Sequence, residues 1–386
     1  MMLDKPVAFS DALCVQAEVR GGVGFITLNR PKALNALSLD MIRLLTMQLL
    51  AWGDDPVVKA VAVRGTSKSG PFGVFCAGGD IRFFHEAAHA NDPSLDDFFT
   101  EEYTLNHLIH SFPKPYIVFM DGIVMGGGMG LCGHARGAAA SATPVSTLRI
   151  ATNRTKMAMP ETLIGLFPDV GGGYFLSRCP GHVGEWLALT GESIGAAEAL
   201  AFGLADTCFT SDQLSLAWDA LARLDFSTTN PIGSWLAIYS VAAHAIESRD
   251  RGLIDQYFSH ESVSDIVNAL QADGGEWAQQ TAVALLKRSP LMLQVTLAQI
   301  RRAGSLSFAD DLRMERDMVH HCFHTRHLGR VGEYSETVEG IRALAVDKDN
   351  APRWNPDRID AVSTDIVDSF FNSPWTKQDH PLRDLT

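Results

Sequence analysis

Two carboxylates stand in a stretch that is otherwise apolar. Residues 157–174 read MAMPETLIGLFPDVGGGY, and Glu161 and Asp169 are the only charged side chains in it. Burial raises the pKa of a carboxyl group, and neighbouring buried acids can then take separate acid and base roles. Each acid alone has a simpler explanation, because Pro160 suits a first helical turn that would contain Glu161, and Asp169 could cap a helix through Tyr174. Together, they indicate a catalytic pair.

Two glycine-rich loops precede this stretch. CAGGD (76–80) and GGGMGLCG (126–133) each follow an expected strand and open an expected helix. Close packing of a helix start against a strand would explain such glycines. A helix N-terminus also presents free N–H groups that stabilise developing negative charge, and two such loops could converge on one carbonyl oxygen.

The second loop also satisfies the G-x-G-x-x-G pattern of dinucleotide-binding proteins, through Gly128, Gly130 and Gly133. That site needs an acid about 20 residues further on to bind the ribose hydroxyl. No Asp or Glu lies between Asp121 and Glu161. The pattern therefore does not predict a nicotinamide or flavin site.

Glu102 lies in TEEYTLN, on an expected helix between the two glycine loops. Its spacing alone favours a surface charge, as for its neighbour Glu101.

A rival cluster is VHHCFHTRH (319–327), in which His320 and His324 share a helix face and could bind zinc. The glutamate of an HExxH motif is missing, and a solvated helix face explains the pattern equally well. We expect no metal.

The elements that would position these residues alternate between strand and helix. Strand patterns cover 14–31 as a hairpin, 58–65 and 115–122, and helical patterns cover 38–52 and 99–112. Such alternation predicts an α/β architecture with parallel pairing. Helical patterns dominate beyond about residue 180. We therefore expect a catalytic core over 13–210 and a helical C-terminal region over 211–386.

The composition excludes several classes of function. The formal net charge of −13 over 386 residues argues against broad binding of nucleic acid or of anionic membranes. The six cysteines are scattered without a CxxC pair, which is typical of reduced thiols in the cytosol. We see neither a targeting peptide nor a run of about 18 apolar residues, so the sequence predicts a cytoplasmic protein without membrane partners.

Five motifs together resemble the crotonase (enoyl-CoA hydratase/isomerase) superfamily. In chain order they are LNRPKALNALS, FCAGGDI, DGIVMGGGMGL, MPETLIGLFPDVGGGY and LTGESIGAAEALAFGLAD. The tail VEGIRALAVDKDNAPRWNP (338–356) resembles the long C-terminal region of the 3-hydroxyisobutyryl-CoA hydrolase branch. The resemblance implies a crotonase-like spiral of ββα units that binds an acyl-CoA thioester.

The resemblance also implies roles for individual residues. The backbone amides of Gly79 and Gly127 match the family's oxyanion hole, Glu161 its catalytic glutamate and Asp169 its catalytic aspartate. Glu102 matches a substrate-binding glutamate of the hydrolase branch.

One departure from the family pattern separates two reactions. Hydratases carry a second catalytic glutamate two residues after the triple glycine, where this sequence has Gly130. We therefore expect hydrolysis of a 3-hydroxyacyl-CoA thioester, most simply 3-hydroxyisobutyryl-CoA in valine breakdown. Hydration or isomerisation of a short-chain enoyl-CoA stays open as the alternative, and so does an inactive CoA-binding protein.

The remaining expectations concern the substrate's other end and the assembly. CoA would enter as part of the substrate, so no separate cofactor is expected. Among the basic residues, Lys32 ranks first for binding the CoA phosphates. Relatives of this family are often trimers or hexamers, which leaves a homo-oligomer open.

Overall fold

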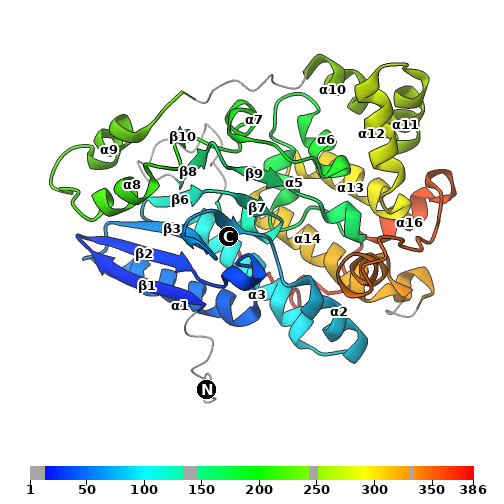
Figure 1. Cartoon of the computed structure of the whole chain (residues 1–386). Coiled ribbons are helices and arrows are strands. Elements are labelled where there is room, and N and C mark those ends of the chain that lie inside the picture. The colour runs from blue at the N-terminus through cyan, green and yellow to red at the C-terminus, as the bar shows by residue number, and fades with distance from the viewer. Residues whose placement is uncertain (1–13, 134–146, 243–250, 331–333) are drawn as a thin grey trace.

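The computed structural model of the chain describes residues 14–133, 147–242, 251–330 and 334–386 (Figure 1). Its larger sheet has the order β1-β2-β3-β6-β8-β10, with β4 paired to β3. These strands are β1 (Val15–Arg20), β2 (Val23–Leu28), β3 (Ala60–Ser67), β4 (Gly70–Pro71), β6 (Tyr116–Met120), β8 (Thr147–Thr152) and β10 (Thr207–Phe209). The β1–β2 pair is the predicted antiparallel hairpin, and β2, β3, β6, β8 and β10 pair in parallel, as predicted.

A second, smaller sheet has the order β5-β7-β9, and its strands are also parallel. They are β5 (Val74–Cys76), β7 (Ile123–Met125) and β9 (Lys156–Ala158). Along the chain, β3, β6 and β8 of the large sheet are followed by β5, β7 and β9 of the small one. Each turn of the chain thus adds one strand to each sheet, which confirms the expected spiral within an α/β fold.

Helices up to position 201 connect these turns. They are α1 (Leu39–Asp54), α2 (Ile81–Ala90), α3 (Ser94–His110), α4 (Gly127–Gly130), α5 (Gly172–Leu176), α6 (Val183–Thr190) and α7 (Ala196–Ala201), with the short 3-10 helices η1 (Pro31–Ala33) and η3 (Glu161–Ile164). The first helix begins where predicted, because the Ser38 hydroxyl accepts a hydrogen bond from the N–H of Met41 at 3.3 Å.

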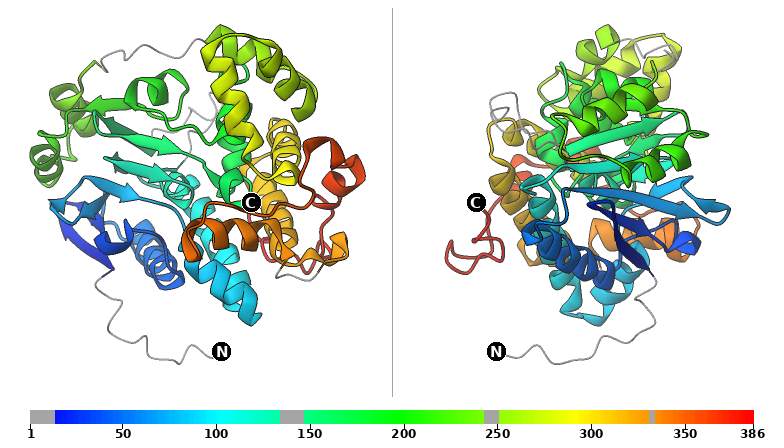
Figure 2. Two further views of the ribbon diagram at one scale, coloured as in Figure 1. Left: turned by 45° about the vertical axis from the view of Figure 1, so that its right-hand side comes forward. Right: turned by 90° about the vertical axis from the view of Figure 1, so that its left-hand side faces the viewer.

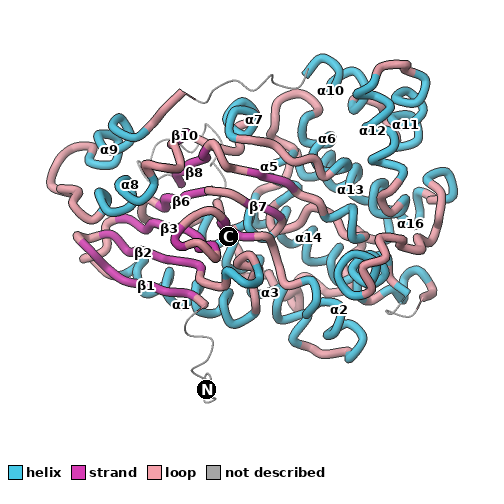
Figure 3. The backbone as a smooth tube through the Cα atoms, viewed as in Figure 1, coloured by secondary structure: helices cyan, strands magenta, loops and turns pink. Residues whose placement is uncertain are grey.

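The second half of the chain is helical, as predicted. Its helices are α8 (Leu214–Leu221), α9 (Pro231–Tyr239), α10 (Arg251–Phe258), α11 (Val263–Ala272), α12 (Glu276–Leu286), α13 (Pro290–Ala303), α14 (Phe308–Phe323), α15 (Glu336–Ile341) and α16 (Thr364–Ser369), with the 3-10 helices η4 (Thr325–Leu328) and η7 (Ile359–Ala361) and the π-helical η6 (Arg342–Val346). Figure 3 shows the strands gathered on one side and helices α10 to α16 on the other.

The hydrophobic core crosses the expected boundary at residue 210. Helices α13 and α14 pack against α3, α5 and α6 of the first region, and the left view of Figure 2 shows the yellow to orange helices beside green and cyan ones. The ring of Phe323 on α14 lies 6.3 Å from that of Phe84 and 5.5 Å from that of Phe99. The division into two regions stays a prediction, but buried apolar side chains from both regions pack together in each of two clusters.

No helix among the described residues combines the length and the apolar character that a membrane crossing requires.

Candidate active site

The two glycine loops meet at one edge of the small sheet. Strands β5 and β7 are parallel neighbours, so the loops that follow them leave from the same edge. Gly78 and Gly126 turn the chain there with φ angles of +104° and +49°, in the region that favours glycine. The loops approach closely, since a Cβ built on Gly127 would lie 3.5 Å from the backbone nitrogen of Gly79.

Both loops present a free backbone amide at this edge. Hydrogen bonds from Leu37 N–H to Gly78 O (2.8 Å) and from Asp80 N–H to Leu37 O (3.0 Å) hold the chain on either side of Gly79. Within the described ranges, the N–H groups of Gly79 and Gly127 donate to no protein acceptor. Two fixed and unused donors side by side can bind one oxygen that gains negative charge.

Neither position leaves room for a side chain. A Cβ on Gly79 would lie 2.6 Å from the ring of Phe84, and a Cβ on Gly127 would lie 2.5 Å from Oε1 of Glu102. The glycines therefore serve close approach as well as turning, which also explains why they occur in runs.

Three carboxylates surround the cavity that these loops line. Glu102 on α3, Glu161 at the start of η3 and Asp169 before α5 are only 2%, 6% and 5% exposed. The cavity measures about 170 Å³. Its apolar walls come from Ile81, Phe84, Leu163, Ile164, Leu166 and Leu344. Among the described residues, Oε1 of Glu102 and Oε2 of Glu161 have no hydrogen-bond partner.

These carboxyl groups are weak acids, because they are buried and no cation in the described part of the chain pairs with them. Burial raises the pKa of Glu161 well above its usual value, and the nearby Asp169 raises it further. Burial likewise raises the pKa of Glu102, with added repulsion from Asp169 and Glu161. The pKa of Asp169 rises to about 6 through burial, although the hydroxyl of Tyr103 donates to its Oδ2 at 2.9 Å and opposes the rise. A base with a raised pKa near neutrality is suited to proton transfer.

The local explanations for Glu161 and Asp169 fail in different ways. Glu161 does open a helical turn after Pro160, but the turn is the single 3-10 turn of η3. Asp169 does not cap α5, since the N-cap is Gly171 and only the backbone carbonyl of Asp169 accepts from Gly172 N–H. Its carboxyl group faces the cavity instead.

Glu102 is buried and lines the cavity, so the surface position predicted from its spacing alone was wrong, while its role in binding substrate stays a prediction. Its neighbour Glu101 is partly exposed and pairs with Arg43 at 2.7 Å. The sequence reasoning missed Tyr103, although it directly follows Glu102.

Position 130 cannot accept a second glutamate in this packing. A Cβ on Gly130 would lie 2.7 Å from Nδ2 of Asn106 and 2.7 Å from Cβ of Val170. The space that a side chain at Gly130 would enter is filled by these two residues.

Lys32 lies apart from the acids. It is exposed on η1 and does not line the cavity, so its contact with CoA stays a prediction. Its neighbour Arg30 pairs with Asp80 at 2.8 Å, beside Gly79.

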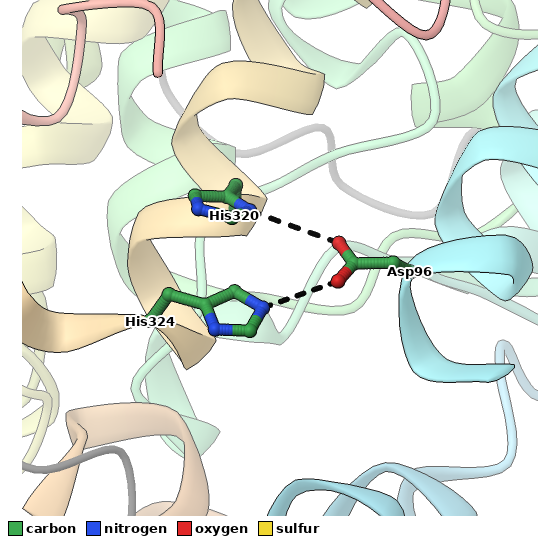
Figure 4. Close-up of side chains that lie close together, drawn as sticks. All are labelled: Asp96, His320 and His324. Atoms are coloured by element: carbon green, nitrogen blue, oxygen red, sulfur yellow. Dashed lines mark hydrogen bonds and ion pairs between the residues drawn. The ribbon is translucent and has the colours of Figure 1, made fainter. Parts of the chain in front are cut away.

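The histidine pair on α14 has a protein partner. Figure 4 shows His320 and His324 turned toward Asp96 of α3, with N···O distances of 3.7 and 3.2 Å. The shared face was predicted correctly, but the face is not merely solvated. The three side chains could supply metal ligands. Arg316 already pairs with Asp96 at 2.6 Å and supplies a positive charge, so we interpret the group as an ion-paired contact between α3 and α14.

Fold and site together define a member of the enoyl-CoA hydratase/isomerase family, and the family profile of that name matches residues 23–371. The chain belongs to this family. Two crystal structures share its fold, titled a carnitinyl-CoA dehydratase from Mycobacterium thermoresistibile and an enoyl-CoA hydratase from Rhodobacter sphaeroides. The first has a TM-score of 0.81 at 36% identity and covers 93% of this chain and 96% of its own. The second has a TM-score of 0.79 at 32% identity and covers 94% and 98%.

Among curated relatives, the 3-hydroxyisobutyryl-CoA hydrolase, mitochondrial, of Gallus gallus is 38% identical over 92% of this chain and 88% of its own length. The protein of the same name from Mus musculus is 37% identical over 94% and 90%. The family resemblance is thereby confirmed. The word mitochondrial in these names contradicts the expectation of a plainly cytoplasmic protein.

Proposed function

We propose that this chain hydrolyses the thioester bond of a 3-hydroxyacyl-CoA, with 3-hydroxyisobutyryl-CoA as its substrate in valine breakdown. The observation that carries the proposal is the cavity itself: three buried carboxylates that have no counter-ion among the described residues lie beside two backbone amides that donate to none of those residues. The relatives of that name, which align over most of their length, support the choice of substrate.

In the proposed reaction, the thioester carbonyl oxygen accepts hydrogen bonds from the amides of Gly79 and Gly127. Negative charge builds on this oxygen as the acyl carbon becomes tetrahedral. Fixed donors stabilise that charge without reorganising, and each donor contributes roughly 10²- to 10³-fold in rate by analogy with other oxyanion holes.

Glu161 is the proposed base. Its carboxylate takes a proton from water, and the resulting hydroxide adds to the acyl carbon. The C–S bond then breaks, and the leaving CoA thiolate receives the proton that Glu161 had taken. Direct attack by Glu161 to form a mixed anhydride is the other route, and water would then cleave the anhydride. Single turnover in H₂¹⁸O tests for the anhydride, since attack of water on the Glu161 carbonyl carbon of the anhydride leaves label in Glu161, which the general-base route never does. Asp169 holds the water or the substrate.

Glu102 would give the preference for a hydroxylated acyl group. Its Oε1 has no partner within the described part of the chain and lies next to Gly127, so it can accept a hydrogen bond from the substrate's 3-hydroxyl. An acyl group without that hydroxyl would leave the buried oxygen unpaired, which a polar site rejects strongly. The small cavity suits a short acyl chain, while CoA itself remains part of the substrate and Lys32 contacts its phosphates.

Hydratase chemistry is the second candidate, because both closely similar crystal structures carry hydratase or dehydratase titles. Gly130 argues against it, since no acid stands there and the surrounding packing leaves no room for one.

Thiol release separates the two functions. Purified protein is incubated with 3-hydroxyisobutyryl-CoA, isobutyryl-CoA and crotonyl-CoA, and both free thiol and enoyl absorbance are followed. We expect thiol release from the first substrate, much less from the second, and loss of release in Glu161→Gln. Loss of crotonyl absorbance without thiol release would establish the hydratase instead. Binding of all three without turnover would indicate an inactive CoA-binding protein.

A further inference from the structure

The turn that carries Asp169 is held by side chains from the C-terminal helices. The carboxylate of Glu315 on α14 accepts hydrogen bonds from the N–H groups of Gly171 at 2.7 Å and Gly173 at 2.9 Å. One turn earlier on the same helix, Asp311 accepts from Tyr174 N–H at 2.9 Å. These donors are the unpaired amides at the start of α5, which need acceptors from outside the helix.

The other side of Asp169 is held as well. Nε2 of Gln299 on α13 donates to the carbonyl of Pro168 at 2.7 Å and to Oε1 of Glu315 at 3.2 Å. Gln299, Glu315 and Asp311 are all fully buried. One connected set of buried polar groups therefore forms hydrogen bonds with the backbone immediately before and after Asp169.

The backbone between these hydrogen bonds is strained at Val170. Val170, directly after Asp169, has a φ of +57°, which is rare for a β-branched residue. Such a conformation is unfavourable by itself and persists only where the surroundings enforce it. The bonds to Pro168 and Gly171 on either side, with the packing of Val170 against Gly130, provide that enforcement.

We infer that Glu315 and Asp311 are positioning residues that cap α5 in place of Asp169. An aspartate just before a helix ordinarily turns its carboxylate onto the first free amides. Here acids more than 130 residues away occupy those amides, so the Asp169 carboxylate is left to face the cavity and Tyr103. This inference rests on the proposed role of Asp169 in the reaction.

Burial raises the pKa of Asp311 to about 7, and burial and the nearby Asp311 together raise that of Glu315. The C-terminal region would thus contribute to catalysis without supplying an acid to the cavity.

The test is Glu315→Gln, whose amide keeps the size but places N–H groups against N–H donors. Asp169 should then turn back onto the amides of Gly171 and Gly173 and lose its bond to Tyr103. We expect kcat for thiol release to fall roughly 10- to 100-fold, because small misplacements of reacting groups cost about this much. KM should change little, and the acid limb of the pH profile should move to lower pH, because a carboxylate that accepts from backbone amides favours its charged form.

Asp317→Asn is the matched control. Asp317 is a buried acid on the same helix, but it accepts from Ser373 at 2.7 Å and pairs with His380 at 3.3 Å. This variant should keep the wild-type kcat and pH profile. A folded Glu315→Gln with wild-type kcat and pH profile, or an equal loss in both variants, would overturn the inference.

Two further measurements keep the inference testable. If Glu315→Gln does not fold, Gln299→Met removes the bond to Pro168 at similar volume, and the same pH shift is expected with a smaller loss of kcat. A wild-type pH profile in that variant would count against the inference. A crystal structure of either variant reads the Tyr103–Asp169 distance directly. It distinguishes a failed positioning role, in which the 2.9 Å bond persists, from a failed proposed function, in which wild-type protein releases no thiol.

Discussion

Two of the acids on helix α3, Asp96 and Glu102, lie six residues apart in opposite environments. Burial works against the charged form of Asp96, yet His320, His324 and Arg316 surround it and hold its pKa well below its usual range. Glu102 is buried among two other carboxylates, and its pKa is raised well above its usual value. The difference lies in the neighbours, since both acids lie on one helix.

The comparison teaches how this fold separates structural acids from reactive ones. At Asp96 the positive charge comes from α14 and fastens two helices together. Around Glu102, none of the ion pairs among the described residues includes Glu161, Asp169 or Glu102 itself. A carboxylate with a cation is a stable anion, whereas one without a cation retains affinity for a proton and can exchange it.

The largest effect on activity is expected from adding a side chain at Gly127, which lines the cavity beside Glu102. Gly127→Ala places a methyl group 2.5 Å from Oε1 of Glu102, so both this oxygen and the amide of residue 127 must shift. Thiol release should fall about 10²-fold or more, measured as kcat/KM. Gly274→Ala is the control, since a Cβ there meets nothing within 4 Å. Unchanged kcat/KM in Gly127→Ala would remove this amide from the proposed oxyanion hole.

Removing the guanidinium that pairs with Asp96 should lower the stability of the fold. Arg316→Met deletes a buried guanidinium that pairs with Asp96 and donates to Thr100 at 3.0 Å. We expect the free energy of unfolding at pH 7 to fall by about 2 kcal/mol, measured by denaturant titration.

The pH dependence of that loss has a definite sign. Because the pKa of Asp96 is lowered in the fold, its ion pair stabilises above the ordinary aspartate pKa near 4 and is lost as the pH falls. The difference in the free energy of unfolding between wild type and Arg316→Met should therefore become smaller at acid pH. A gap that widens in acid would contradict this account.

A smaller effect should follow from loosening Asp169. Tyr103→Phe removes the hydroxyl that lowers the pKa of Asp169, so this pKa should rise above about 6. The acid limb of kcat/KM should move to higher pH, with about a tenfold loss near neutrality, in line with a hydrogen bond to a charged group. Tyr257→Phe, which loses only a bond to Asp273, should leave the limb in place. An unmoved limb in Tyr103→Phe would assign it to another group.

The smallest expected effect is a gain in the free energy of unfolding when a buried cavity acid is removed. Since the pKa of Glu102 is raised in the fold, its charge destabilises the protein above the ordinary glutamate pKa near 4. Glu102→Gln should raise the free energy of unfolding by about 1 kcal/mol at pH 7 to 8, and this gain should vanish as the pH falls toward 4. Glu101→Gln, next to it and paired with Arg43, should show no such gain. Equal unfolding curves for the two variants would mean that burial of the Glu102 carboxyl group does not lower the free energy of unfolding.

Much of the α/β part could be predicted from local patterns. The hairpin around Gly21 and Gly22, the cap at Ser38 and the strand–helix alternation each depend on near neighbours in sequence. The glycine loops were also legible, because positive φ angles and close approach both require glycine. The burial of Glu102 could not be predicted from its spacing, since Gly127, Glu161 and Asp169, which lie close to its carboxyl group, come much later in the sequence.

The sequence by itself determined which groups could react: two carboxylates in an apolar stretch, two runs of glycine at strand ends, and no acid at position 130. Only the tertiary structure decided what each group does. Asp169 could have capped α5, and His320 and His324 could have faced solvent, until Glu315 took the free amides and Asp96 met the histidines. The physical reason is that a carboxylate's pKa and direction depend on charges and donors brought close by folding, which the order of residues does not display.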